Sequence, residues 1–208
     1  MDLGAYRIGS SMFRSVLGAA ILTCLSVAPA LAAGDPAAGR AESFCSALVD
    51  TVRQSKGQGA QARIKKLQPL VEESFNTRIM GQFATGPAWD AMTEAEKSAV
   101  VAALTRYSAG RLAQEFDSYS GQTCVVDPAV QTRGADKLVK SRIALPGEQP
   151  TALNYRLREY GGGWKIVDIY YEGVSQLATQ RADFAGVLHS GGAAGLVKRL
   201  NDLTASLR

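Results

Sequence analysis

Residues 153–171 read LNYRLREYGGGWKIVDIYY, and this stretch decides the fold. Apolar and charged or amide side chains alternate from Leu153 to Arg158, which is typical of a strand with one buried face. Residues 164–171 are rich in β-branched and aromatic side chains and form a second expected strand. Because three glycines, residues 161–163, lie between the two runs, the sequence predicts an antiparallel hairpin.

Two further strands are expected before this hairpin. Residues 139–145 alternate between apolar and polar or small side chains, and residues 125–132 form a weaker candidate because Pro128 cannot donate a backbone hydrogen bond to a neighbouring strand. One polar face on each strand indicates a sheet that is covered on one side only. The sequence therefore predicts an antiparallel sheet of about four strands.

Helical spacing fills the sequence on both sides of these strands. Residues 44–52 carry apolar side chains every four positions, and a second helix is expected to kink or restart at Pro69. The clearest helix begins at Thr93, since Thr93–Glu96 forms a capping box. Two helices separated at Gly192 follow Ser175. Helices before and after an antiparallel sheet indicate the α+β class. One face of the Thr93 helix carries Val101, Leu104, Ser108, Leu112 and Phe116.

Residues 1–32 are expected to be a secretory signal peptide. Arg7 and Arg14 form a basic leader, residues 16–28 carry no charge, and Ala30-Leu31-Ala32 matches a small-x-small cleavage site. The apolar run is shorter than the ~20 residues that a membrane-spanning helix needs. An uncleaved membrane anchor is the alternative. After cleavage, residues 33–208 would form one exported domain.

Composition and charge exclude several classes of function. The 208 residues are 46% hydrophobic with a net charge of +4, which fits a packed domain and gives no reason to expect nucleic-acid binding. The single histidine, His189, stands before Ser190-Gly191-Gly192, where a capping role at a helix end is expected rather than a catalytic one. No ligand-type residues share a metal-binding spacing. We therefore expect no enzyme activity, no metal site and no cofactor other than a bound ligand.

Cys45 and Cys124 would remain after removal of the signal peptide. An oxidising compartment would allow them to form a disulfide. A bridge across a loop of about 80 residues would contribute roughly 4 kcal/mol in the chain-entropy treatment. Two buried free thiols are an equally good interpretation of the sequence.

Residues 164–175 read WKIVDIYYEGVS, and together with Arg181 and Phe184 they resemble the signature of the MlaC family, also called toluene-tolerance auxiliary proteins. Residues 86–89, read as GPAW, and the helix from Thr93 are similar to the central block of that family. The resemblance extends over nearly all of the chain after the signal peptide.

Residues 116–121, read as FDSYSG, also resemble the hopanoid-associated branch of the family, called HpnM. The chain departs from the family at Phe75-Asn76, where relatives often carry Phe-Asp. That departure removes the acidic group from this position.

The resemblance implies an NTF2-like cone in which N-terminal and C-terminal helices and the sheet enclose an apolar pocket. Family members are periplasmic carriers that hold a phospholipid by its acyl tails, and the hopanoid branch implies a hopanoid-type lipid instead. They pass the lipid between an outer-membrane lipoprotein complex and an inner-membrane lipid transporter. The chain is accordingly expected to act in the periplasm, as a monomer, with transient partners.

The acyl-chain wall is expected to combine inward-facing residues of the helices and the sheet, although an ordinary core would show the same spacing. An isomerase that uses Asp168 and Tyr155, inside the same kind of cone, is one alternative function. A non-lipid envelope adaptor, with a filled core and an exposed apolar patch, is another. The residues expected in the wall are Ile79, Phe83, Trp89, Val101, Leu104, Ile143, Tyr155, Ile166 and Val174.

Overall fold

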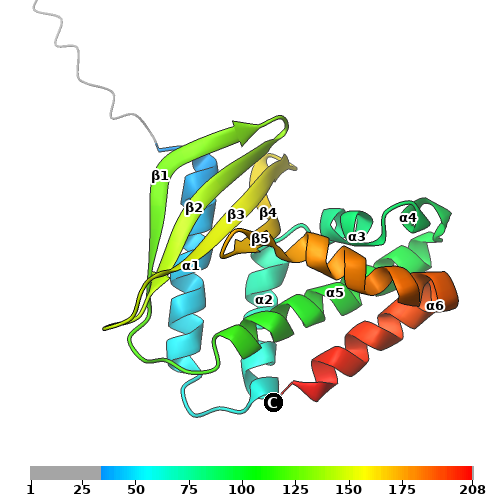
Figure 1. Ribbon diagram of the computed structural model, residues 1–208, viewed down its shortest axis with the longest axis horizontal. Coiled ribbons are helices and arrows are strands. Elements are labelled where there is room, and N and C mark those ends of the chain that lie inside the picture. Colours follow the sequence, from blue (N-terminus) through cyan, green and yellow to red (C-terminus); the bar gives the residue numbers. More distant parts are fainter. Residues whose placement is uncertain (1–33, 208) are drawn as a thin grey trace, which may run out of the picture. The chain divides into compact units, whose positions relative to one another are not determined.

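A computed structural model describes residues 34–207 of the chain as six helices and five strands (Figure 1). The signal peptide expected at residues 1–32 lies outside the described residues. The helices are α1 (Pro36–Gln54), α2 (Ala60–Ser74), α3 (Thr77–Thr85), α4 (Ala88–Ala91), α5 (Glu94–Glu115) and α6 (Gln176–Ser206). The strands are β1 (Thr123–Arg133), β2 (Asp136–Ala144), β3 (Thr151–Tyr160), β4 (Gly163–Tyr171) and β5 (Val174–Ser175).

The strands form one open antiparallel sheet in the order β1-β2-β3-β4-β5. The predicted hairpin joins β3 to β4, and its two loop residues, Gly161 and Gly162, have φ angles of 60° and 78°. Only glycine adopts such angles at little cost, so the sequence and the tight turn agree. The α+β class is confirmed, and the sheet gains a short fifth strand, β5, beyond the four expected.

A bulge in β4 decides which side chains face the helices. Leu157 pairs with Ile166, whereas the preceding residue of β3, Arg156, pairs with Asp168, so Val167 has no partner across the strand pair. A residue inserted in this way shifts every later side chain of the strand to the other face. Strict alternation along β4 would place Asp168 on the same face as Ile166, and the bulge prevents this. Asp168 lies on the face of Arg156.

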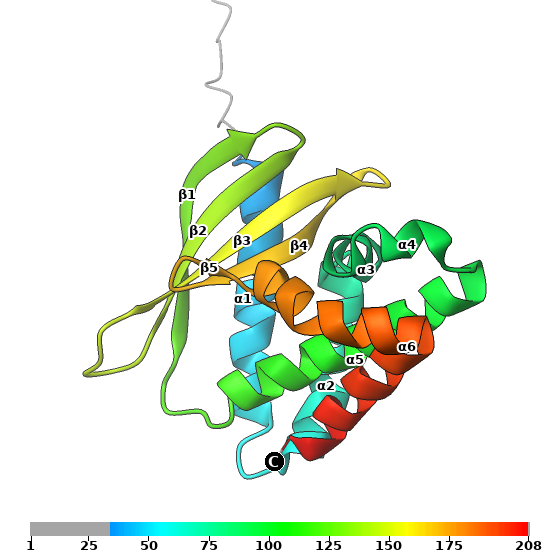
Figure 2. The same cartoon turned by 45° about the vertical axis from the view of Figure 1, so that its right-hand side comes forward.

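The first helix covers one face of the sheet (Figures 1 and 2). Phe44 of α1 meets the rings of Tyr155 and Phe75 edge to face, with centroids 5.6 and 5.2 Å apart. Cys45, one position on, is joined to Cys124 of β1 as a disulfide, with Cα atoms 5.9 Å apart. Packing of large aromatic side chains and this cross-link fix α1 against the sheet.

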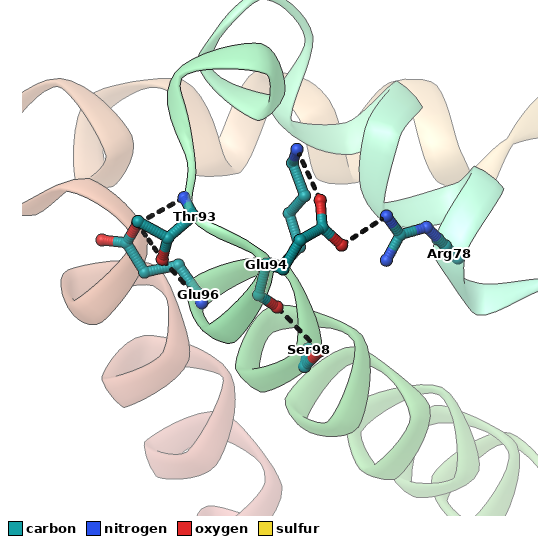
Figure 3. Close-up of polar contacts among 6 residues, drawn as sticks. Arg78, Thr93, Glu94, Glu96 and Ser98 are labelled. Carbon is teal, nitrogen blue, oxygen red and sulfur yellow. Dashed lines mark hydrogen bonds and ion pairs between the residues drawn. The ribbon is translucent and has the colours of Figure 1, made fainter.

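The other helices pack mainly against one another beside the sheet (Figure 2). The predicted capping box at the start of α5 is confirmed, because the Thr93 hydroxyl accepts from the Glu96 N–H and the Glu96 carboxylate accepts from the Thr93 N–H (Figure 3). α2 runs through Pro69 as one helix, so of the two expected alternatives, a kink or a restart, the restart is wrong. Gly192 breaks α6, as predicted, with a φ of 57° and a ψ of −154°.

A buried carboxylate ties β2 to β3 on the face that carries Arg156. Asp136 is 3% exposed and accepts hydrogen bonds of 2.5 Å from the Nε atoms of Arg156 and Arg158. Burial by itself would raise the pKa of Asp136, but the hydrogen bonds and charges of Arg158 and Arg156 outweigh burial and hold this pKa below its usual value. The ionised form is therefore favoured in the folded protein.

Asp136→Asn is expected to lower the free energy of unfolding by about 2 kcal/mol at pH 7, because charge-assisted hydrogen bonds to two arginines are lost. Since the folded-state pKa is depressed, this contribution is present above the unfolded-state pKa of about 4 and is lost as the pH falls from there through the folded-state pKa. Urea midpoints at pH 7 and pH 3 test this expectation. An equal difference between wild type and variant at both pH values would contradict it.

Candidate functional site

A cavity of about 200 Å³ lies where α5 and the first turns of α6 meet β3 and β4. Half of the residues around it have apolar side chains. The apolar lining consists of Phe75, Met80, Leu112, Phe116, Leu153, Ile169 and Leu177. The polar lining consists of Ser108, Arg111, Glu115, Asp168, Tyr171, Gln176 and Gln180. A cavity that combines apolar side chains with polar groups is the usual form of a small-molecule site.

Three local features of the sequence build this cavity. Ser108, Leu112 and Phe116 recur every four residues of the α5 stripe, so they line one wall. The β4 bulge turns Ile169 to the same face as Tyr155 and brings it to the opposite wall. The start of α6 is fixed by Ser175, whose hydroxyl accepts from the Ala178 N–H.

Asp168 holds the first turn of α6 in place. Its carboxylate accepts from the Ser175 hydroxyl at 2.6 Å and from the Leu177 N–H at 3.0 Å. Burial raises the pKa of Asp168, and these hydrogen bonds partly oppose the shift. Both bonds satisfy backbone or hydroxyl donors of the helix start, which is the role of a capping carboxylate.

Asp168 and Tyr155 do not form the acid–base pair that an isomerase would need. Tyr155 is fully buried, does not line the cavity, and directs its hydroxyl to the Cys45 sulfur at 3.5 Å. Asp168 lines the cavity, but its cross-strand partner is Arg156 rather than Tyr155, and its carboxylate is engaged by Ser175 and Leu177. The structure thus does not bring Asp168 and Tyr155 together at one position where a substrate could react.

Asp168→Ala is expected to lower the free energy of unfolding by about 1 kcal/mol, through loss of the cap, and to leave ligand content unchanged. Asp168→Asn, which keeps one acceptor oxygen for the Leu177 N–H, is the matched control and should lose less. Urea unfolding and ligand content of the purified variants check both points. Loss of ligand without loss of stability would show that the carboxylate acts on the ligand.

A second cavity of about 190 Å³ adjoins the first, toward residues 117–122. The two cavities share the side chains of Glu115, Phe116, Leu153 and Tyr171, which separate them. The negative charge of Glu115 is the largest of the causes that raise the pKa of Tyr171. Movement of the shared side chains would join the two spaces into one longer channel.

A wider depression of about 600 Å³ lies between the start of α5 and the second half of α6. Its lining is mostly alanine and charged or amide side chains, such as Ala99, Ala193 and Asn201. It is more open to solvent than the first cavity, and its apolar wall consists mainly of short alanine side chains, so we take the more enclosed cavity as the functional site.

The nine residues that the sequence analysis assigned to the wall do not line the first cavity. Leu104, Tyr155 and Ile166 are buried in the packed core, with at most 1% of their surface exposed. Ile143 lines the second cavity. Val174 is 57% exposed on β5, so its expected inward orientation is wrong.

The remaining four residues lie on α3, α4 and α5. Trp89 is buried beside Gly81, with Arg78 above its ring at 5.5 Å. Phe83 lies 5.4 Å from the Arg156 guanidinium, on the face of the sheet that carries Asp136. Ile79 and Val101 are half-buried. These side chains stabilise helix packing rather than enclose the cavity.

The described part of the chain has neither a group of metal-ligating side chains nor a membrane-spanning helix. Residues 34–207 contain no group of three or more His, Cys, Asp or Glu side chains arranged to hold a metal ion. Within the same range, no helix combines the length and the apolar character required to cross a bilayer.

An apolar cavity enclosed between an antiparallel sheet and packed helices defines a ligand-binding domain. The chain belongs to the MlaC family, because the family's sequence profile, described as MlaC protein, matches residues 42–202. Its structure is similar to that of a phospholipid-binding protein from Ralstonia solanacearum, solved in complex with a phospholipid. The two chains are 24% identical with a TM-score of 0.68, and the match covers 83% of this chain and 99% of that one.

Proposed function

We propose that this protein is a periplasmic lipid carrier that holds an acyl chain of a phospholipid, or of a hopanoid-type lipid, in the cavity between α5, α6 and β4. The observation that carries the proposal is the apolar lining of this cavity, in a chain of the MlaC family whose structural relative was solved with a phospholipid. The carrier acts as a monomer. It delivers lipid between an outer-membrane lipoprotein complex and an inner-membrane lipid transporter.

The physical requirements of a carrier fit the residues around the cavity. Each methylene moved out of water contributes about 0.8 kcal/mol, so a sixteen-carbon chain gains roughly 12 kcal/mol from apolar contacts. Leu112, Leu153 and Ile169 supply such contacts, and the charged Arg111 and Glu115 lie at the edge of the site. Transfer of a lipid needs no nucleophile and no proton transfer.

The volume of the cavity sets a condition on binding. About 200 Å³ is below the roughly 300–1,000 Å³ of typical ligand sites, so a lipid tail requires more space than the cavity holds. The adjoining cavity supplies that space once the side chains of Phe116 and Tyr171 move apart. Lipid entry and this rearrangement are therefore coupled in the proposed mechanism.

The proposed carrier reaches the periplasm by export and removal of its signal peptide. Cleavage after Ala32 would release residues 33–208 into the periplasm. Intact-mass measurement of protein recovered from the periplasm tests the cleavage position, and recovery of the full-length chain there would contradict it.

Lipid extraction tests the proposed function. The protein is purified from the periplasm without detergent, denatured in organic solvent, and its extract analysed by mass spectrometry. A carrier yields about one lipid per chain, and the masses distinguish phospholipid from hopanoid-type lipid. Protein that folds normally but releases no lipid, and extracts none from vesicles, would favour the adaptor alternative.

A further inference from the structure

Two polar atoms in the cavity wall have no hydrogen-bond partner. Among the described residues, Ser108 Oγ and Gln180 Oε1 are the only buried side-chain nitrogen or oxygen atoms left unpaired. Both residues line the same apolar cavity, Ser108 from α5 and Gln180 from α6. Ser108 is 7% exposed, so bulk solvent does not satisfy its hydroxyl.

The free hydroxyl of Ser108 is unusual for this protein. Serine and threonine within helices commonly donate to the carbonyl four residues earlier, which removes the penalty of burial. Thr105, on the preceding turn of α5, donates in this way to the Val101 carbonyl at 2.9 Å, and Thr85 donates to the Gly81 carbonyl at 2.8 Å. Ser108 makes no such bond, so its hydroxyl remains available to a molecule in the cavity.

Two neighbouring polar groups of the cavity are already engaged. Asp168 accepts from Ser175 and Leu177, and the Gln176 amide donates to the Val174 carbonyl at 3.2 Å. A buried polar atom without a partner destabilises the folded protein, and a ligand that supplies the partner gains that free energy on binding. The unpaired groups of Ser108 and Gln180 thus specify what the ligand must carry.

We propose that Ser108 and Gln180 recognise a polar segment of the lipid that has a free hydroxyl beside an ester carbonyl, as in a single-chain lysophospholipid. This inference rests on the proposed function and refines its ligand class. The Ser108 hydroxyl donates to the ester carbonyl, and the lipid hydroxyl donates to Gln180 Oε1, which only accepts. A diacyl lipid presents ester oxygens here and no donor, so it leaves Gln180 Oε1 unpaired. A single acyl chain also needs less of the space that the adjoining cavity must supply than two chains would need.

A matched pair of ligands tests the recognition. Binding of palmitoyl lysophosphatidylcholine is compared with binding of the analogue in which hydrogen replaces the glycerol hydroxyl, both below their critical micelle concentrations. Wild type is expected to bind the hydroxyl lipid about fivefold more tightly, the effect of one neutral hydrogen bond. Gln180→Leu should bind the two lipids equally. Ser108→Ala should weaken binding of both by a similar factor.

Gln176→Leu is the control variant, because Gln176 lines the same cavity but already has a partner. It should keep the preference for the hydroxyl lipid. Equal affinity of wild type for the two lipids, or a preference that survives Gln180→Leu, would overturn the inference and leave the lipid-carrier function standing. If wild type bound neither these lipids nor dipalmitoyl phosphatidylcholine from vesicles, the proposed function itself would fail.

Discussion

Leu112→Trp is expected to reduce the lipid content of the purified protein by about tenfold or more while leaving the fold intact. Leu112 lies on α5 and lines the cavity, so a larger side chain grows into space that a lipid tail would otherwise fill. The empty space absorbs the added volume, and the free energy of unfolding should change by no more than about 1 kcal/mol. Lipid phosphorus per chain and urea midpoints of delipidated protein measure the two effects.

Leu104→Trp is the matched control two turns earlier on the same helix. Leu104 is 1% exposed in the packed core and does not line the cavity. The same substitution there overpacks the core and should cost about 1–3 kcal/mol. The opposite result is a stable Leu104→Trp protein without lipid and a Leu112→Trp protein that still carries lipid. That result would show that the lipid binds at the wall predicted from the sequence.

Loss of the Cys45–Cys124 bond is expected to lower the free energy of unfolding by about 4 kcal/mol. The two residues are 79 positions apart, and a cross-link over so long a loop strongly restricts the unfolded chain. The bond joins α1 to β1, so its removal also frees the helix that covers the sheet. Urea unfolding with and without reductant measures the effect.

The thiol count of denatured protein tests the disulfide directly. No reactive thiol should appear at Cys45 or Cys124 before reduction, and two should appear afterwards. The Cys45→Ala/Cys124→Ala double variant provides the control, because its stability should not respond to reductant. Two free thiols in protein recovered from the periplasm would reject the disulfide.

Much of the fold could be predicted because local signals and tertiary structure agree. The capping box at Thr93, the glycine turn between β3 and β4 and the break at Gly192 each reflect a local backbone requirement, and each is found in the structure. The α2 helix differs, since tertiary packing keeps it continuous through Pro69. Local propensity alone does not include that packing energy.

The site was harder to predict because its position depends on one inserted residue. Strict alternation along β4 would place Asp168 on the same face of the sheet as Ile166. The bulge at Val167 exchanges the two faces for the residues that follow, and Ile169 then faces the cavity. On α5 the stripe was visible in sequence, but periodicity does not distinguish Leu104, in the core, from Leu112, at the cavity. The unpaired state of Ser108 is a property of three-dimensional packing and has no sequence signal.

Photo-crosslinking with a phospholipid that carries a diazirine on one acyl chain tests the central claim most directly. After vesicle extraction and irradiation, peptide mapping should place the label on α5 at Leu112, on Phe116 just after that helix, or on β4 at Ile169, and Leu112→Trp should remove it. Labelling confined to exposed residues, or to the side chains around Ile79, Trp89 and Val101, would contradict the account.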